Sequence, residues 1–148
     1  SWYGAVSIDH AEHLKEGDVE QLLKSGIAVG ILPICNVELN TGIQPDARKL
    51  IDAGVELFLA TDFNAGSSFC TSLLEVGELA LRDLKMSNEE VLKSITSTPA
   101  KILGLEKLGK IEKGSIADIG IWENGLDKFF SPVNNLQMLF IEGHEVLN

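Results

Sequence analysis

Ile27–Ile34, with the sequence IAVGILPI, is the apolar stretch from which the fold of this chain can be predicted. A strand with one face in water alternates apolar and polar residues, whereas a strand covered on both faces is apolar throughout. This stretch has no such alternation. It therefore predicts a central strand of a parallel sheet.

Two further strands are predicted on either side of it, at residues 5–10 and 55–60. Helices are expected to follow all three strands. The first has Asp18 as its expected cap and Gly26 as its end, the second runs from Pro45 to Gly54, and the third spans residues 72–84. Strand and helix thus alternate three times, which indicates an α/β fold with right-handed parallel crossovers.

The second half of the chain changes in texture. Ser87 with Glu90 predicts a capping box, and a further helix is expected from Thr98-Pro99 to Gly104. From Leu108 onward the sequence is rich in glycine. It contains two strand candidates, residues 119–122 and 137–141, and neither repeats nor low-complexity segments. We therefore expect a boundary between residues 105 and 110, which divides the chain into 1–107 and 108–148.

Residues whose side chains can bind a ligand or take part in catalysis follow each of the three predicted strands: His10, then Cys35-Asn36, then Asp62 and Asn64. In (β/α)8 barrels the reactive groups stand at the carboxyl ends of the strands. No glycine-rich phosphate loop follows any strand, which disfavours a nucleotide-binding open sheet. A complete barrel takes about 250 residues. The chain, which begins without Met, is thus expected to be the C-terminal portion of a longer barrel.

The composition narrows the classes of partner. Twelve basic and 22 acidic residues give a formal charge of −10, which would repel nucleic acid and an anionic membrane surface. The two cysteines indicate no disulfide framework, and no signal peptide or membrane span is visible. We expect a cytoplasmic protein with a small-molecule substrate. A homo-oligomer is also expected, because a cut edge of a parallel sheet invites pairing.

Considered one at a time, each candidate residue could have a structural role without taking part in catalysis. Asp62 can cap the turn after its strand, as Asp commonly does. His10 and His13 can be structural or solvated, and His144 is expected at the surface near a turn. The serines and cysteines lack the surroundings of a known nucleophile motif, and a glycosidase pair of Asp62 with a glutamate has no positional support.

Four segments together resemble a known family. VSIDHAEHL (6–14) and LATDFNAGSS (59–68) look like the last barrel strands of the imidazolonepropionase family. TPAKILGL (98–105) and GKIEKGSIADI (109–119) are similar to the end segment shared by many amidohydrolases, where the chain leaves the barrel for a small β-sandwich. The implied fold is the last three βα units of a (β/α)8 barrel followed by part of that sandwich.

The resemblance also implies the roles of site residues. Asp62 matches a metal-ligating aspartate that also accepts a proton from the attacking water, and His10 matches a substrate-contacting histidine that, if neutral, donates a hydrogen bond to the carbonyl oxygen. Asn64, Gly66 and Ser67 match the stretch that holds the substrate or product. The implied cofactor is one Zn or Fe ion, which lowers the pKa of a bound water. The family's His-x-His pair, its third metal-binding His and its catalytic Glu have no counterpart in this sequence.

The implied reaction is hydrolysis of 4-imidazolone-5-propanoate to N-formimidoyl-L-glutamate in histidine degradation. With so incomplete a ligand set, the 148-residue chain alone is expected to be inactive. Another amidohydrolase, either a cyclic amide hydrolase or a deaminase, is an alternative. So is a half-barrel that binds a partner without catalysis.

Overall fold

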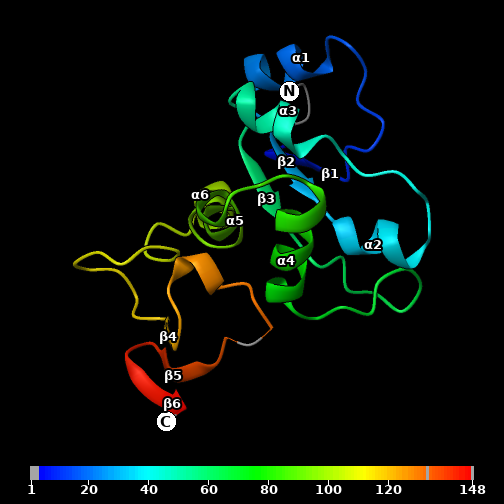
Figure 1. The fold of residues 1–148 in the computed structure, drawn as a ribbon. Coiled ribbons are helices and arrows are strands. Elements are labelled where there is room, and N and C mark those ends of the chain that lie inside the picture. The colour runs from blue at the N-terminus through cyan, green and yellow to red at the C-terminus, as the bar shows by residue number, and fades with distance from the viewer. Residues whose placement is uncertain (1–3, 133, 148) are drawn as a thin grey trace.

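The computed structural model describes residues 4–132 and 134–147, which form a mixed α/β fold with two separate sheets (Figure 1). Along the chain the elements are β1 (Ser7–Asp9), α1 (Asp18–Ser25), β2 (Ala28–Ile31), α2 (Pro33–Glu38), α3 (Ala47–Asp52), β3 (Leu57–Leu59), α4 (Leu73–Asp83), α5 (Asn88–Ile95), α6 (Ser97–Ile102), β4 (Ile119–Trp122), the 3-10 helix η1 (Leu126–Lys128), β5 (Leu136–Ile141) and β6 (His144–Leu147).

The first sheet is parallel, with the order β1-β2-β3. Its central strand β2 is buried at every position, as the apolar stretch predicted. In register, Ile8 lies beside Val29, which lies beside Leu57. The predicted extension of this strand to Ile34 was wrong. Pro33 has no N–H to donate to a sheet and instead opens helix α2, where a missing N–H costs nothing.

Two predicted helix starts are displaced. Asp18 is the first residue of α1 rather than its cap, since the cap position is taken by Gly17 in the left-handed conformation. The second predicted helix corresponds to α3. It begins at Ala47, and its cap is Asp46, whose side chain accepts a hydrogen bond from the Lys49 N–H. The predicted start at Pro45 was therefore wrong by two residues.

Other local signals are confirmed. Gly26 ends α1 with a φ of 65°, which an L side chain adopts only at a cost. Ser87 and Glu90 form the predicted reciprocal capping box at the start of α5, and Ser72 caps α4 through the Glu75 N–H. All these interactions lie within a few residues of one another, which is why the sequence alone predicted the end of α1 and the capping box of α5, whereas the Ser72 cap was not predicted.

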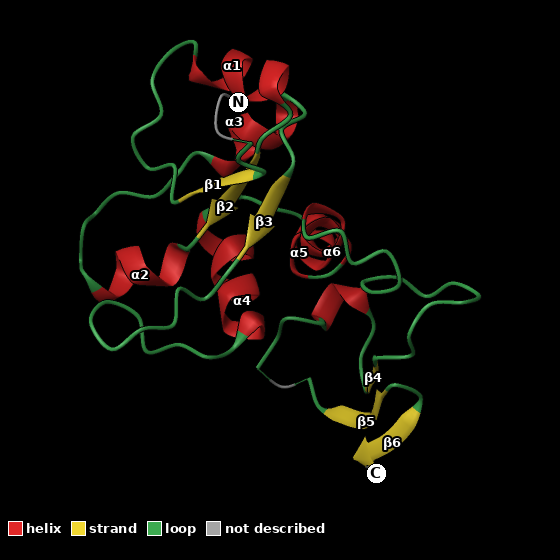
Figure 2. Ribbon diagram, turned by 180° about the vertical axis from the view of Figure 1, so that it is seen from behind, coloured by secondary structure: helices red, strands yellow, loops and turns green. Residues whose placement is uncertain are grey.

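The core lies between the parallel sheet and its helices. Helices α3, α4, α5 and α6 all contact β3, as seen from behind in Figure 2. Val29 and Ile31 of β2 have no exposed surface, and neither do Val76 of α4 and Val91 of α5. Burial of such side chains stabilises a fold by about 1.5–3 kcal/mol each. This packing holds the strand ends in fixed positions.

The second sheet is antiparallel, with the order β4-β5-β6. Strands β4 and β5 confirm the predictions for residues 119–122 and 137–141, whereas β6 was not predicted. Phe130 connects this part of the chain with the first: it is 4% exposed and packs against Gly77 of α4, where a Cβ would lie 2.5 Å from the ring. Gly77 is thus required for this close approach.

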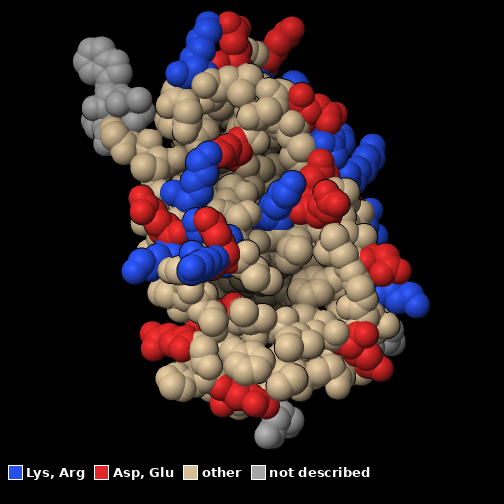
Figure 3. Space-filling model, turned by 90° about the vertical axis from the view of Figure 1, so that its left-hand side faces the viewer, with Lys and Arg blue, Asp and Glu red and all other residues tan. Residues whose placement is uncertain are grey.

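Charges are spread over the surface. On the face shown in Figure 3, acidic and basic side chains are interspersed around an uncharged central area. No helix within the described residues is long and apolar enough to cross a membrane.

Candidate functional site

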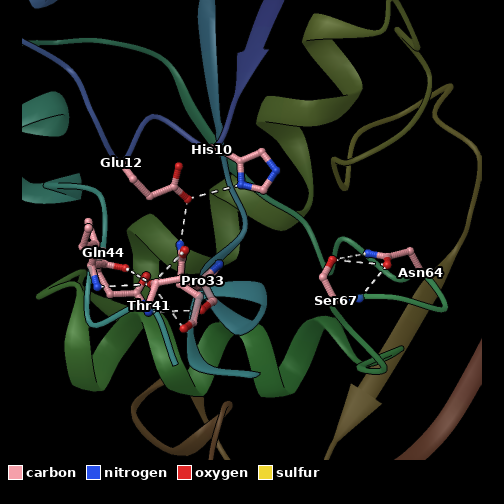
Figure 4. A network of polar contacts seen from close by, with 9 residues as sticks. His10, Glu12, Pro33, Thr41, Gln44, Asn64 and Ser67 are labelled. Carbon is pink, nitrogen blue, oxygen red and sulfur yellow. Dashed lines mark hydrogen bonds and ion pairs between the residues drawn. The ribbon is translucent and has the colours of Figure 1, made fainter. Parts of the chain in front are cut away.

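The carboxyl ends of the three parallel strands bring the candidate residues to one edge of the sheet. His10 follows β1, Cys35 and Asn36 lie in α2 just after β2, and Asp62 follows β3. Parallel strands side by side place such residues next to one another. The residues after the first two strands are connected by side-chain contacts through Glu12, while Asn64 and Ser67 form a separate group in the loop after the third strand (Figure 4).

Glu12 connects the first strand end to the second. Its Oε1 atom accepts a hydrogen bond from Asn36 Nδ2 at 2.7 Å and lies 3.2 Å from His10 Nδ1. Asn36 is 8% exposed, and its own Oδ1 accepts from the Thr41 hydroxyl at 3.3 Å. The orientation of the Asn36 amide is therefore set by partners on both of its polar atoms.

Glu12 is the functional residue that the sequence reasoning missed. A signal was present, because a carboxylate two residues beyond a strand-end histidine is well placed to contact the imidazole. Burial alone would raise the pKa of Glu12, but hydrogen bonds from Asn36, the backbone and His10 lower it below its usual value. The Glu12 side chain is 12% exposed, whereas that of His10 is 45% exposed. The Glu12 carboxylate is thus largely buried and fixed by hydrogen bonds, whereas the imidazole that it contacts is accessible.

The backbone is strained at the first and third strand ends. His10 and Ala11 have φ values of 75° and 66°, and Asp62 has a φ of 54°. Such left-handed conformations cost non-glycine residues on the order of 1–3 kcal/mol each and persist where surrounding contacts enforce them. Two of the three, His10 and Asp62, are the catalytic residues predicted from the sequence. Strain of this kind clusters at functional sites.

Asn64 organises the loop after β3. Its Oδ1 accepts hydrogen bonds from the N–H groups of Gly66 and Ser67, both at 2.8 Å, and its Nδ2 donates to the Asp62 carbonyl at 2.6 Å and the Ser67 hydroxyl at 2.9 Å. Ser68 also anchors the loop. Its side chain has no exposed surface, and its hydroxyl donates a hydrogen bond to the Thr61 carbonyl at 2.7 Å. Three predicted substrate-binding residues therefore form one ordered turn.

Cys35, at the second strand end, is affected by groups at the third. Asp62 and Ser67 both influence the pKa of its thiol. Burial raises the pKa of the Cys35 thiol and the Asp62 carboxylate acts in the same direction, while the Ser67 hydrogen bond lowers it. The thiol is therefore neutral at physiological pH and serves as a packing and hydrogen-bonding group beside Asp62.

His10 and Asp62, the two predicted catalytic residues, follow the two outer strands of the sheet, and α2 follows the strand between them. His10 is connected to Asn36 of α2 through Glu12. Asp62 raises the pKa of the Cys35 thiol, which is also in α2. Helix α2 was not predicted from the sequence. His13 and His144 are both exposed, and a surface position was predicted for His144.

The donor set at this edge fits one ligand of a metal ion. Asp62 supplies a carboxylate, the hard oxygen donor that divalent ions accept. Among residues 4–132 and 134–147, however, no three His, Cys, Asp or Glu side chains come together in a way that could hold a metal ion. The described part of the chain therefore does not form a complete metal site by itself.

A separate cavity of about 520 Å³ lies away from these residues. It is lined mainly by apolar side chains of α5, the segment 108–120, β4 and β5. None of the predicted site residues borders it. A smaller cavity of about 200 Å³ borders Glu12. The three parallel strands cannot by themselves enclose a space as a closed barrel does.

Carboxylate and imidazole groups at the carboxyl ends of parallel strands are where reactive residues stand in barrel enzymes. Residues 6–146 match the amidohydrolase family, and the chain belongs to this family. It is 41% identical over 116 residues to an imidazolonepropionase from Streptomyces coelicolor, a match that covers 78% of this chain and 29% of the relative. An imidazolonepropionase from Alteromonas mediterranea is 36% identical over 121 residues, or 82% of this chain and 29% of the relative.

A solved structure shares the fold. The zinc-bound adenosine deaminase from Xanthomonas campestris superimposes with a TM-score of 0.79 at 20% identity, covering 95% of this chain and 36% of that one. The resemblance to imidazolonepropionases found in the motifs is thus confirmed. The chain spans less than a third of the length of these curated relatives.

Proposed function

We propose that this chain supplies one side of the active site of a hydrolase that opens a cyclic amide, with 4-imidazolone-5-propanoate as substrate and N-formimidoyl-L-glutamate as product in histidine degradation. The observation that carries the proposal is the set of polar groups at the carboxyl edge of the sheet, where Glu12 joins His10 to Asn36 and Asn64 orders the loop that follows Asp62. The identity to imidazolonepropionases supports the choice of substrate.

The architecture follows from the same proposal. Residues 1–107 form the last three βα units of a (β/α)8 barrel, and residues 108–148 contribute to a small β-sandwich. The three parallel strands and the antiparallel β4-β5-β6 sheet are compatible with this division. The remaining strands belong to a longer protein, in line with the length of the relatives.

In that complete protein Asp62 is one ligand of a single divalent ion, Zn or Fe. The other ligands come from residues outside this sequence, because the described residues contain no complete set. The zinc bound in the Xanthomonas campestris deaminase, which shares the fold of this chain, supports the presence of a divalent ion in the complete protein. A bound ion of this kind supplies a water of lowered pKa and polarises the carbonyl that is attacked.

The residues of this chain have separate tasks in the reaction. Hydrolysis adds the oxygen of water to the carbonyl carbon, breaks the ring C–N bond and leaves the proton on nitrogen. Asp62 accepts the proton of the attacking water, as a nearby carboxylate can. The turn formed by Asn64, Gly66 and Ser67 positions the substrate, and its own hydrogen bonds hold it in shape.

The setting of the protein completes the proposal. It is a cytoplasmic homo-oligomer that acts on a small molecule and binds neither nucleic acid nor membranes. The formal charge of −10 supports the last point, because it repels both of these anionic partners.

Two alternatives have support of their own. A deaminase is favoured by the fold shared with the Xanthomonas campestris enzyme. A half-barrel that binds a partner without catalysis is favoured by the missing ligand cluster in the described residues. One experiment distinguishes all three.

The test uses the complete protein that contains this chain, purified with its metal and assayed with 4-imidazolone-5-propanoate and with adenosine. We expect ring opening of the imidazolone and no release of ammonia from adenosine. Asp62→Asn should reduce turnover by at least about a hundredfold, because it removes a charged ligand and a proton acceptor. The matched control is Asp127→Asn at an exposed position of η1, which should leave turnover unchanged. Deamination, or turnover of neither compound, would overturn the proposal.

A further inference from the structure

We infer that Glu12 is a positioning residue that sets the tautomer of His10, with the proton on Nδ1 and the lone pair of Nε2 facing the site. The inference rests on the proposed function for its catalytic meaning. It concerns a residue that the motif comparison did not single out. Its basis is the contact network of Figure 4.

Glu12 Oε1 can only accept hydrogen bonds. An ionised carboxylate has no proton to donate, and hydrogen bonds from Asn36 and His10 favour the ionised form. Nδ1 of His10, 3.2 Å from this oxygen, must therefore carry a proton. In a neutral imidazole the other nitrogen, Nε2, is then an acceptor.

The second step is that Glu12 cannot easily turn away. Its oxygen is shared with Asn36 Nδ2 at 2.7 Å, and the Asn36 amide cannot flip without losing the hydrogen bond that its Oδ1 accepts from Thr41. The Asn36 carbonyl also accepts a hydrogen bond from the Thr41 N–H at 3.1 Å. The chain of partners thus runs from helix α2 through Glu12 to the imidazole.

The third step is that the backbone enforces the same arrangement. His10 and Ala11 are both in the left-handed conformation, and the Ala11 N–H bonds to the Asp9 carbonyl at 3.2 Å. This tight reversal brings the side chain of residue 12 back beneath that of residue 10.

His10 therefore has a different chemical role from the one expected from the sequence, in which the neutral imidazole donates a hydrogen bond to the carbonyl oxygen of the substrate. With Nδ1–H held by Glu12, neutral His10 accepts a hydrogen bond or a proton at Nε2. A cyclic amide offers a suitable partner, because its ring N–H is a donor. His10 then recognises the N–H of the substrate rather than its carbonyl oxygen.

The test reads the tautomer directly and does not depend on activity. The 148-residue chain contains only three histidines, so 15N-histidine labelling and long-range 1H–15N spectra can assign His10 by comparison with His13→Gln and His144→Gln. At a pH where the ring is neutral, we expect the protonated type of 15N shift at Nδ1 and the unprotonated type at Nε2. The opposite pattern would overturn the inference without any variant.

Glu12→Gln gives the second arm. An amide can both donate and accept, so we expect His10 to show a mixture of the two tautomers. The matched control is Glu16→Gln, an exposed glutamate of the same loop, which should leave the His10 pattern unchanged. An unchanged pattern in Glu12→Gln would overturn the inference.

The catalytic meaning is tested in the complete enzyme. Glu12→Gln should lower kcat/KM by about 10- to 100-fold, the usual effect of removing a group that orients a functional histidine, while the metal content stays the same. If the complete enzyme does not act on the imidazolone at all, the proposed function fails, yet the tautomer measurement still decides the role of Glu12. Near-normal kcat/KM for Glu12→Gln in an active enzyme would overturn the positioning role.

Discussion

Glu90 connects two helices and offers a quantitative test of the fold around the site. Its carboxylate accepts hydrogen bonds from both terminal nitrogens of Arg48 in α3, each at 2.9 Å, and from the Ser87 N–H at 2.8 Å. Bidentate pairs of this kind are stronger than single hydrogen bonds. The Arg48 pair lowers the pKa of Glu90 from 4.5 to about 2, against the opposing effect of burial.

This pKa sets the size and the pH range of the effect. A fall from 4.5 to about 2 corresponds to an upper limit of about 3 kcal/mol. The side chains of Arg48 and Glu90 are 33% and 29% exposed, so solvent screening reduces the expected contribution to about 1–2 kcal/mol. Because the folded-state pKa is the lower one, the contribution is complete above about pH 4.5 and is lost between about pH 4.5 and pH 2.

Urea unfolding of Glu90→Gln and of the unmodified chain measures this contribution. At about pH 7 we expect the variant to be less stable by about 1–2 kcal/mol, and the difference should narrow as the pH falls toward 2. Glu89→Gln, at an exposed position in the same helical turn, is the matched control and should change stability by less than about 0.5 kcal/mol. Equal stability of the two variants at neutral pH, or a difference that does not depend on pH, would refute the reasoning.

Four further predictions concern the site and the packing around it. Asn64→Ala removes the hydrogen bonds that shape the loop after β3, so in the complete enzyme it should raise KM and leave the metal content intact; unchanged KM and turnover would exclude Asn64 from the site. The 148-residue chain alone should bind no stoichiometric metal and hydrolyse no imidazolone, because Asp62 by itself cannot compete with water for the ion; metal analysis and a turnover assay check both points. Gly77→Ala should destabilise the fold by about 1–3 kcal/mol in urea unfolding, since the new methyl group meets Phe130. The isolated chain should associate at high concentration, and light scattering that shows a stable monomer would contradict this.

Much of the fold could be predicted because its signals are local. The unbroken apolar pattern of β2 identified a strand covered on both faces, and Ser87 with Glu90 identified the start of α5. A strand pattern or a capping box depends on residues within one or two turns of one another. The motif around Asp62 was read in the same way, since it is contiguous in sequence.

Where local signals compete, the sequence was ambiguous. Pro33 lies inside an apolar run that reads as a strand, yet the chain turns there into α2. Asp46 and Pro45 are both acceptable at a helix start, and packing of Ala47 and Leu50 into the core selected Asp46 as the cap. Core packing outweighs such small differences in propensity.

The candidate site itself was decided by tertiary structure. The sequence by itself identified which residues have side chains suited to catalysis or ligand binding, among them His10 and Asp62. Glu12 and Asn36, which form a hydrogen bond, are 24 positions apart, and Asp62 affects the pKa of Cys35 across a similar separation along the chain. Only the pairing of three parallel strands, with α2 folded across their ends, brings these groups into contact. No local pattern records such a contact, because its free energy depends on the packing of the whole sheet.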